Sequence, residues 1–221
     1  MLQAYRTIQR EASDVFVERR SRFIGHIRPV QTESEALAFV AEKKKEYWDA
    51  THNVYAYVLR DGGIRRYSDD GEPQGTAGIP VLEVLLKEGL TDCVVVVTRY
   101  FGGILLGGGG LIRAYSHGAR LAVDAGIRLD MRPCDRAEIH CDYAQYGWVH
   151  PLLLSSGGVL EDTVYTEEVT LIFHIPQERT AVLEGALTEQ SAGRLVLQRL
   201  DSVYCPFSVE VERSDGDTIK K

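Results

Sequence analysis

The chain has 221 residues, a formal net charge of −7 and 44% hydrophobic residues, which is typical of a globular protein with one large domain or two small ones. Its longest apolar runs, such as the four valines at 94–97, are far too short to span a bilayer. Residues 1–133 carry 18 Lys and Arg against 17 Asp and Glu, whereas residues 134–221 carry 7 against 15. This distribution excludes a strongly basic nucleic-acid-binding protein and confines any anion site to an arginine patch in the first half.

The first half is predicted to form an open sheet of about four strands with helices on one face. The strands are expected at SDVFVERR (13–20), RFIGHIRPV (22–30), HNVYAYVLR (52–60) and the buried central run CVVVVTRY (93–100). One helix begins after Thr32, where Glu35 completes a capping box. A polar loop at 65–75 precedes a second helix within 76–89, and a third helix is expected at 111–125.

The second half follows a βαββαβ order, which is that of the ferredoxin-like fold. Its strands are expected at 137–143, 159–165, 169–175 and 194–204, with helices at 143–156 and 177–190. The chain is therefore α+β, with domains at 1–133 and 134–208, a linker at 131–134 and a flexible tail at 209–221. The four cysteines form no CxxC pair and the N-terminus has no apolar signal segment, so we expect a cytoplasmic protein with reduced thiols.

The most informative stretch is RYFGGILLGGGGLIRAY at 99–115, which joins a strand to a helix. Its glycines imply positive φ angles or the close approach of another group, and Arg99 and Arg113 suggest that this group is an anion. The segment matches neither the phosphate-binding loop of nucleotide hydrolases nor the dinucleotide fingerprint. A tight connection, an anion contact and a protein-contact loop all remain open.

The polar segment SDDGEPQGTAGIP at 68–80 is the second candidate. Asp69, Asp70 and Glu72 have the oxygen ligands that Mg²⁺ prefers, but their spacing is not that of a calcium-binding loop. We favour a fixed loop in which Thr76 caps the second helix and Glu72 or Asp70 pairs with Arg65, Arg66 or Arg99.

The pair His52-Asn53 precedes the third strand. A histidine can act as a general base, yet the sequence offers no evident nucleophile for it to activate. We therefore expect the pair to hold loop geometry through hydrogen bonds. Tyrosines and phenylalanines interleave with the arginines and could stack on unpaired bases, although about half of them are expected in the core.

Four ordered segments resemble the motifs of the YigZ/IMPACT family: ERRSRFIGHI (18–27), ATHNVYAY (50–57), DDGEPQGTAGIP (69–80) and VVVTRYFGGILLGGGGLIRAY (95–115). The whole chain resembles the bacterial YigZ type, in which an Impact-like N-terminal domain precedes a small ferredoxin-like domain. The resemblance implies that the first domain has the fold of the second domain of a small-subunit ribosomal protein. It also implies that the second domain resembles domain V of elongation factor G.

The resemblance further implies regulation of translation, because eukaryotic relatives regulate translation by binding a partner protein and bacterial relatives are associated with RNA or ribosomes. With Arg65 and Arg66 added from their charge, the candidate binding residues are His52, Asn53, Arg65, Arg66, Asp69, Asp70, Glu72, Gly75, Thr76, Arg99, Tyr100, Phe101, Gly102, Gly103, Gly107, Gly108, Gly109, Gly110 and Arg113. No catalytic residue, metal or cofactor is assigned.

The leading hypothesis is a non-enzymatic cytoplasmic protein that binds RNA, the ribosome or a translation-associated protein, with arginines contacting phosphates. An alternative is an enzyme that holds a phosphorylated small molecule or nucleotide at the glycine-rich loop. A third possibility is a protein-interaction module that docks through its acidic second domain.

Overall fold

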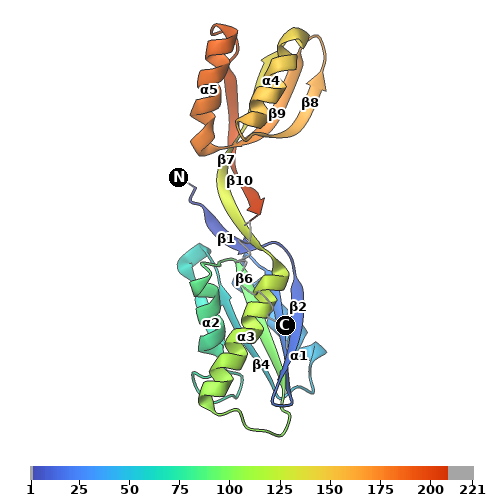
Figure 1. Ribbon diagram of the computed structural model, residues 1–221, viewed down its shortest axis with the longest axis vertical. Helices are drawn as coiled ribbons and strands as arrows, with labels where there is room; N and C mark the ends of the chain where they lie inside the picture. Colours follow the sequence, from blue (N-terminus) through green and yellow to red (C-terminus); the bar gives the residue numbers. More distant parts are fainter. Residues whose placement is uncertain (1, 209–221) are drawn as a thin grey trace, which may run out of the picture. The chain divides into compact units, whose positions relative to one another are not determined.

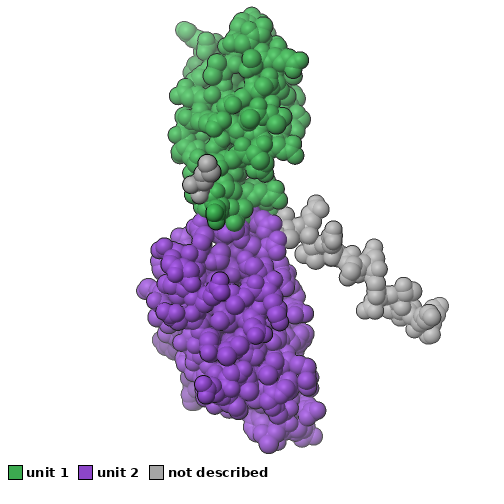
Figure 2. Space-filling model, turned by 90° about the vertical axis from the view of Figure 1, so that its left-hand side faces the viewer, with its two compact units in different colours: residues 1–4, 131–207 green, residues 5–130, 208–221 purple. Residues whose placement is uncertain are grey.

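The computed structural model describes residues 2–208, so the expected tail at 209–221 lies outside the described residues. The described chain forms two compact units, one of residues 5–130 and one of 2–4 with 131–207, coloured separately in Figure 2. Strand β7 (Arg128–Cys141) runs through the boundary, so residues 131–134, expected as a linker, belong to a strand.

The first unit is built on a five-stranded antiparallel sheet with the order β2-β3-β6-β4-β5. Its strands are β2 (Ala12–Glu18), β3 (Ser21–Pro29), β4 (His52–Val58), β5 (Arg65–Ser68) and β6 (Cys93–Tyr100). The sequence predicted four of these strands and missed β5, because its four polar residues carry no apolar alternation. A further short strand, β1 (Tyr5–Ile8), pairs with β7 and was also unexpected.

Helices cover both faces of this sheet, which corrects the expectation that they lie on one face (Figure 1). The helices are α1 (Glu33–Glu46), α2 (Gly78–Lys87), α3 (Gly108–Gly126) and the short 3₁₀ turn η1 (Asp61–Gly63). Along β6, Val95 and Val97 pack in the core of α2 and α3, whereas Val94 and Val96 pack in the core of α1. The continuous valine run is therefore apolar because both of its faces are buried.

The capping box predicted at the start of α1 is present, with Glu35 N donating to Thr32 Oγ1 at 3.2 Å. Gly89 follows α2 with a positive φ of 67°, as expected for a helix end. Within the described residues, every helix is too short or too polar to cross a membrane.

The second unit has the predicted ferredoxin-like order. Its elements are β7, α4 (Tyr143–Ser155), β8 (Val159–Tyr165), β9 (Val169–Pro176), α5 (Gln177–Ser191) and β10 (Leu197–Ser208). The sheet runs β8-β9-β7 with β10 also paired to β7, and its apolar face packs against α4 and α5. The α+β class and the two-domain organisation are thus confirmed.

Candidate functional site

Strand pairing brings two of the predicted motifs into contact in the first unit. His52 lies opposite Arg99, and Asn53 lies opposite Thr98, in the register of β4 and β6. Because α2 and α3 follow the loops at these strand ends, the polar segment at 68–80 and the glycine-rich segment meet beside His52. The site is assembled from residues that are up to 60 positions apart in the chain, from Thr51 to Leu111.

Asp69 organises the loop that precedes α2. Its Oδ2 accepts a hydrogen bond from Gly75 N at 2.9 Å, and its Oδ1 accepts from Ala77 N and Gly78 N at 3.2 and 2.7 Å. The expectation that Thr76 caps this helix is wrong, because the Thr76 hydroxyl donates to Pro73 O instead, at 2.6 Å. A carboxylate carries more charge than a hydroxyl and can satisfy several free amides at once.

His52 and Asn53 hold the Asp70 turn in place, as the sequence predicted. Asn53 N donates to Asp70 Oδ2 at 2.7 Å, and Lys44 Nζ lies 2.5 Å from Asp70 Oδ1. His52 Nδ1 lies 2.7 Å from the carbonyl oxygen of Asp70, which can only accept. His52 Nδ1 is therefore protonated, and in the neutral ring Nε2 is left as an acceptor.

A buried charge cluster lies at the centre of the site. Arg99 Nη1 and the Tyr115 hydroxyl both donate to Glu72 Oε1, at 2.6 and 2.7 Å. The side chains of Arg99 and Glu72 are only 6% and 3% exposed. Burial and the neighbouring Glu72 carboxylate raise the pKa of Tyr115, so its hydroxyl remains a donor. The predicted pairing of Glu72 with an arginine is confirmed for Arg99, which is consequently not a free cation.

These contacts give the three acidic side chains separate partners, since Asp69 binds backbone amides, Asp70 binds Lys44 and Glu72 binds Arg99. They do not converge on a common point, and within residues 2–208 no group of three His, Cys, Asp or Glu side chains is suited to a metal ion. The structure therefore gives no support to the magnesium alternative.

A hollow of about 390 Å³ opens above this cluster, and we call it the His52 hollow. It is lined by Thr51, His52, Gly71, Glu72, Pro73, Arg99, Phe101, Leu105, Leu106, Gly107, Gly108 and Leu111. Phe101 and Leu105 are 44% and 81% exposed, so part of the apolar surface of the hollow is accessible to solvent. The hollow thus combines a polar floor with an apolar wall.

The glycine-rich segment starts helix α3 three residues earlier than predicted. α3 begins at Gly108, after Gly107 at a φ of 71°, and no side chain caps its first turn. Gly107 is required there because a side chain is strained at such an angle. The free amides of this turn lie beside Arg113, which is exposed and makes no ion pair or hydrogen bond with the described residues.

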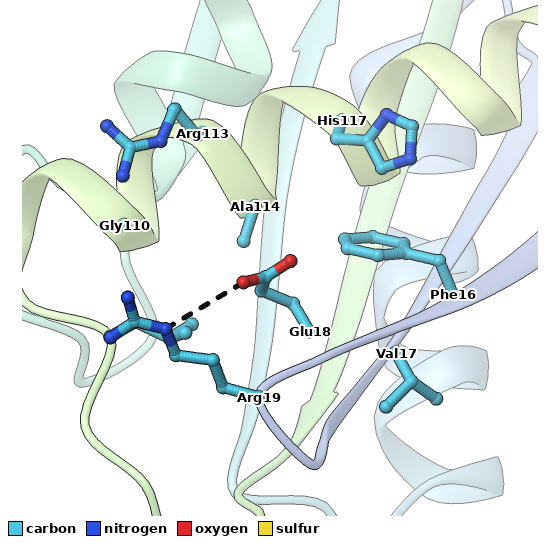
Figure 3. A pocket seen from close by; sticks show the side chains of 9 residues that line it. Phe16, Val17, Glu18, Arg19, Gly110, Arg113, Ala114 and His117 are labelled. Carbon is cyan, nitrogen blue, oxygen red and sulfur yellow. Dashed lines mark ion pairs between the residues drawn. The ribbon is translucent and has the colours of Figure 1, made fainter.

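A second hollow, of about 450 Å³, lies beside this turn, and we call it the Arg113 hollow (Figure 3). It is lined by Phe16, Val17, Glu18, Arg19, Leu106, Gly110, Arg113, Ala114 and His117. In Figure 3, Arg113 comes from α3 and Arg19 from the turn after β2, and Gly110 lies between them. The sole acidic lining residue, Glu18, is 4.0 Å from Arg19.

The turn that carries Arg19 is held against the glycine-rich segment. Arg19 and Arg20 have positive φ angles of 45° and 67°, which are strained for these residues. Gly102 allows the contact, because a Cβ there would lie 2.1 Å from the backbone carbon of Arg20. Gly102 N also donates to Ser21 Oγ at 3.2 Å. The first and last family-like segments are therefore packed together.

Sequence reasoning missed Arg19, His117, Lys44 and Tyr115 as site residues. Arg19 and Tyr115 lie within the family-like segments at 18–27 and 95–115, so their positions there were an available signal, whereas Lys44 and His117 lie outside those segments. Tyr100 lies at the edge of the site, where its hydroxyl donates to Asp49 Oδ1 at 2.8 Å. Gly103 has a φ of 82° and Gly109 lines neither hollow.

Arg65 and Arg66 do not join the other candidates. They are exposed on β5 and pair with Val58 and Tyr57, at the opposite end of β4 from His52. Six residues of extended strand separate His52 from Val58, which corresponds to about 20 Å. Of the four arginines proposed to contact phosphates together, Arg113 alone is exposed beside the glycine-rich segment.

Two known protein families match this chain, one in each unit. The family described as "Impact N-terminal domain" matches residues 19–123, and "Domain of unknown function (DUF1949)" matches residues 139–194. The IMPACT family member YvyE of Bacillus subtilis (strain 168) is 37% identical over 210 residues, covering 95% of this chain and 97% of YvyE. The chain belongs to the IMPACT family. The segment matched to the Impact N-terminal domain contains every residue that lines the His52 hollow.

Other IMPACT proteins match over different lengths. YigZ of Escherichia coli (strain K12) is 34% identical over 186 residues, 83% of this chain and 91% of YigZ. The "Protein IMPACT homolog" of Dictyostelium discoideum is 40% identical over 105 residues, 45% of this chain and 29% of that protein. A solved structure described as "Crystal structure of an hypothetical protein" covers 91% of this chain and 99% of its own, with a TM-score of 0.57 and 31% identity.

Proposed function

We propose that this IMPACT-family protein is a cytoplasmic, translation-associated binding protein whose first unit binds RNA through its phosphates. The observation that carries the proposal is the Arg113 hollow, where two exposed arginines and the free amides of a helix start surround one cavity. Phosphate oxygens accept hydrogen bonds from such arginines and amides, and the helix dipole favours their charge.

The distribution of charge supports a local phosphate site. Arg99 is neutralised by Glu72, whereas Arg113 has no partner among the described residues. The second unit belongs to the acidic half of the chain, which would repel an RNA backbone. We therefore place the phosphates at the Arg113 hollow and not along the whole chain.

The test is the affinity of a ten-nucleotide single-stranded RNA, measured by fluorescence anisotropy over a range of salt concentrations. The combined change Arg19→Gln and Arg113→Gln removes two phosphate contacts, so affinity should fall at low salt and the salt slope for a single strand should decrease by about 1.4. Arg65→Gln with Arg66→Gln is the matched control, since it removes the same charge at the other end of β4.

Unchanged binding in the Arg19 and Arg113 variant would refute the proposal, as would an equal loss in the control variant. Capture of partners from a cell lysate with and without nuclease distinguishes RNA from a protein partner. A partner that is retained after nuclease treatment would favour the translation-associated protein and count against RNA.

The His52 hollow gives less support to the alternative of an enzyme for phosphorylated small molecules. The glycine-rich segment does line it, but the Glu72 carboxylate is in its floor and Arg99 is already paired. A phosphate placed there would approach a carboxylate without gaining a free cation. Saturable thermal stabilisation by one nucleotide or phosphorylated metabolite, lost in His52→Ala, would reverse this preference.

A further inference from the structure

We propose that the His52 hollow receives one unpaired nucleobase of the RNA whose phosphate is held at the Arg113 hollow. This inference rests on the proposed function and adds a second, uncharged site to it. The two hollows share Leu106, and Gly107 and Gly108 line one while Gly110 lines the other. Consecutive Cα atoms are about 3.8 Å apart, so Gly107 and Gly110 lie within about 11 Å of each other, which makes the two hollows neighbours.

The floor of the hollow selects a neutral group that both donates and accepts hydrogen bonds. Glu72 and Arg99 cancel each other's charge, so neither a cation nor an anion gains a free counter-charge there. Arg99 Nη2 and Glu72 Oε2 make no hydrogen bond with the described residues, and His52 Nε2, an acceptor in the neutral ring, lies 3.8 Å from Glu72 Oε1. The hydrogen-bonding edge of a nucleobase, which carries donors and acceptors side by side, fits this set.

The wall of the hollow suits the flat face of the same group. Phe101 is exposed at its rim, and Leu105 and Leu106 provide further apolar surface. The Arg99 guanidinium lies 5.4 Å from the centre of the Phe101 ring, and this cation–π contact holds the ring in place. Exposed aromatic rings beside a basic groove are the usual platform on which unpaired bases stack.

The test compares two strands of equal length and charge, a ten-nucleotide single-stranded RNA and a strand of abasic ribose phosphates. The protein should bind the RNA about tenfold more tightly than the abasic strand, as expected for one stacked base. Phe101→Ala should abolish this preference and leave binding of the abasic strand unchanged. Trp48→Ala, which removes an 81% exposed aromatic that lines neither hollow, should retain the preference.

Filling the hollow is an independent route to the same result. Gly108 has space around it, since the nearest atom to a Cβ there is Thr76 Cγ2 at 3.9 Å. Gly108→Leu should therefore reduce RNA binding to the level of the abasic strand. Gly185→Leu in α5, where a side chain meets open space outside both hollows, is the matched control and should preserve the preference.

The outcomes separate the inference from the function on which it rests. Equal binding of both strands by the unaltered protein, with a loss in the Arg19 and Arg113 variant, would overturn the base site and leave the phosphate site standing. A preference that survives both Phe101→Ala and Gly108→Leu, or that disappears in Trp48→Ala, would also overturn it. Binding of neither strand would overturn both proposals.

Discussion

The buried pair of Glu72 and Arg99 allows a quantitative prediction of stability. Glu72→Gln keeps the shape of the side chain and an acceptor for Tyr115, but leaves the Arg99 guanidinium without a counter-charge where it is 6% exposed. Removing one partner of a buried ion pair costs about 3–5 kcal/mol. The Tyr115 hydrogen bond also loses its charged acceptor, so we expect the upper half of this range.

Native-state hydrogen exchange of the β6 amides is the appropriate assay, because the chain has two units and need not unfold in one step. A loss of 4 kcal/mol corresponds to exchange that is about a thousandfold faster. Glu42→Gln is the matched control, since Glu42 pairs with Arg28 at 2.9 Å but the two side chains are 46% and 30% exposed. That exposed pair should contribute less than about 1 kcal/mol.

Adding Arg99→Met to Glu72→Gln should restore most of the lost stability, because the uncompensated charge is then gone. Exchange in Glu72→Gln less than about tenfold faster than in the unaltered protein would refute the reasoning. A double variant no more stable than Glu72→Gln alone would show that packing, and not charge, accounts for the loss.

Three further predictions concern stability. Asp69→Ala removes an acceptor for three backbone amides and should lower the free energy of unfolding in urea by about 2 kcal/mol or more. An unchanged free energy of unfolding would mean that water replaces the carboxylate. Gly25→Ala places a Cβ 2.1 Å from Gly118 O and should lower the free energy of unfolding by about 3 kcal/mol or more. Gly185→Ala in α5, with open space around it, should stabilise the protein slightly. Similar melting temperatures for the two variants would contradict this prediction. Burial lowers the pKa of His26 to about 4, so its contribution to stability is complete above pH 6.5 and is lost as the pH falls towards 4. The slope of stability against pH in that range should become shallower in His26→Gln, and an identical slope would disprove the assignment.

Much of the fold was predictable because it follows from local patterns. The alternation in β2 and β3, the continuous apolar run of β6 and the capping box at Thr32 each specify their element without reference to the rest of the chain. β5 was missed because its residues, RRYS, become a strand only through pairing with β4. The placement of α1 on the second face was missed because a run of valines indicates a buried strand but does not identify the helix that covers each of its faces.

The membership of the candidate site was predictable only in part, and its geometry was not. Its motifs identified His52, Glu72, Arg99 and the glycines, and the pairing of Glu72 with an arginine followed from charge. The sequence did not reveal that Arg99 is buried by that pair while Arg113 remains exposed, since burial depends on α3 crossing β6. For the same reason the hydrogen bond of Tyr115 to Glu72 is known only from the fold, although Tyr115 ends the glycine-rich stretch at 99–115.

The sequence by itself determined the α+β class, the two-domain order and the family, because these depend on local periodicity and on ordered motifs. Tertiary structure alone decided which arginine is exposed and that the glycine-rich segment borders two hollows instead of one. Exposure and proximity arise when segments that are far apart in the sequence fold against each other. The contact between Gly102 and Arg20, for example, packs the last of the four family-like segments against the first.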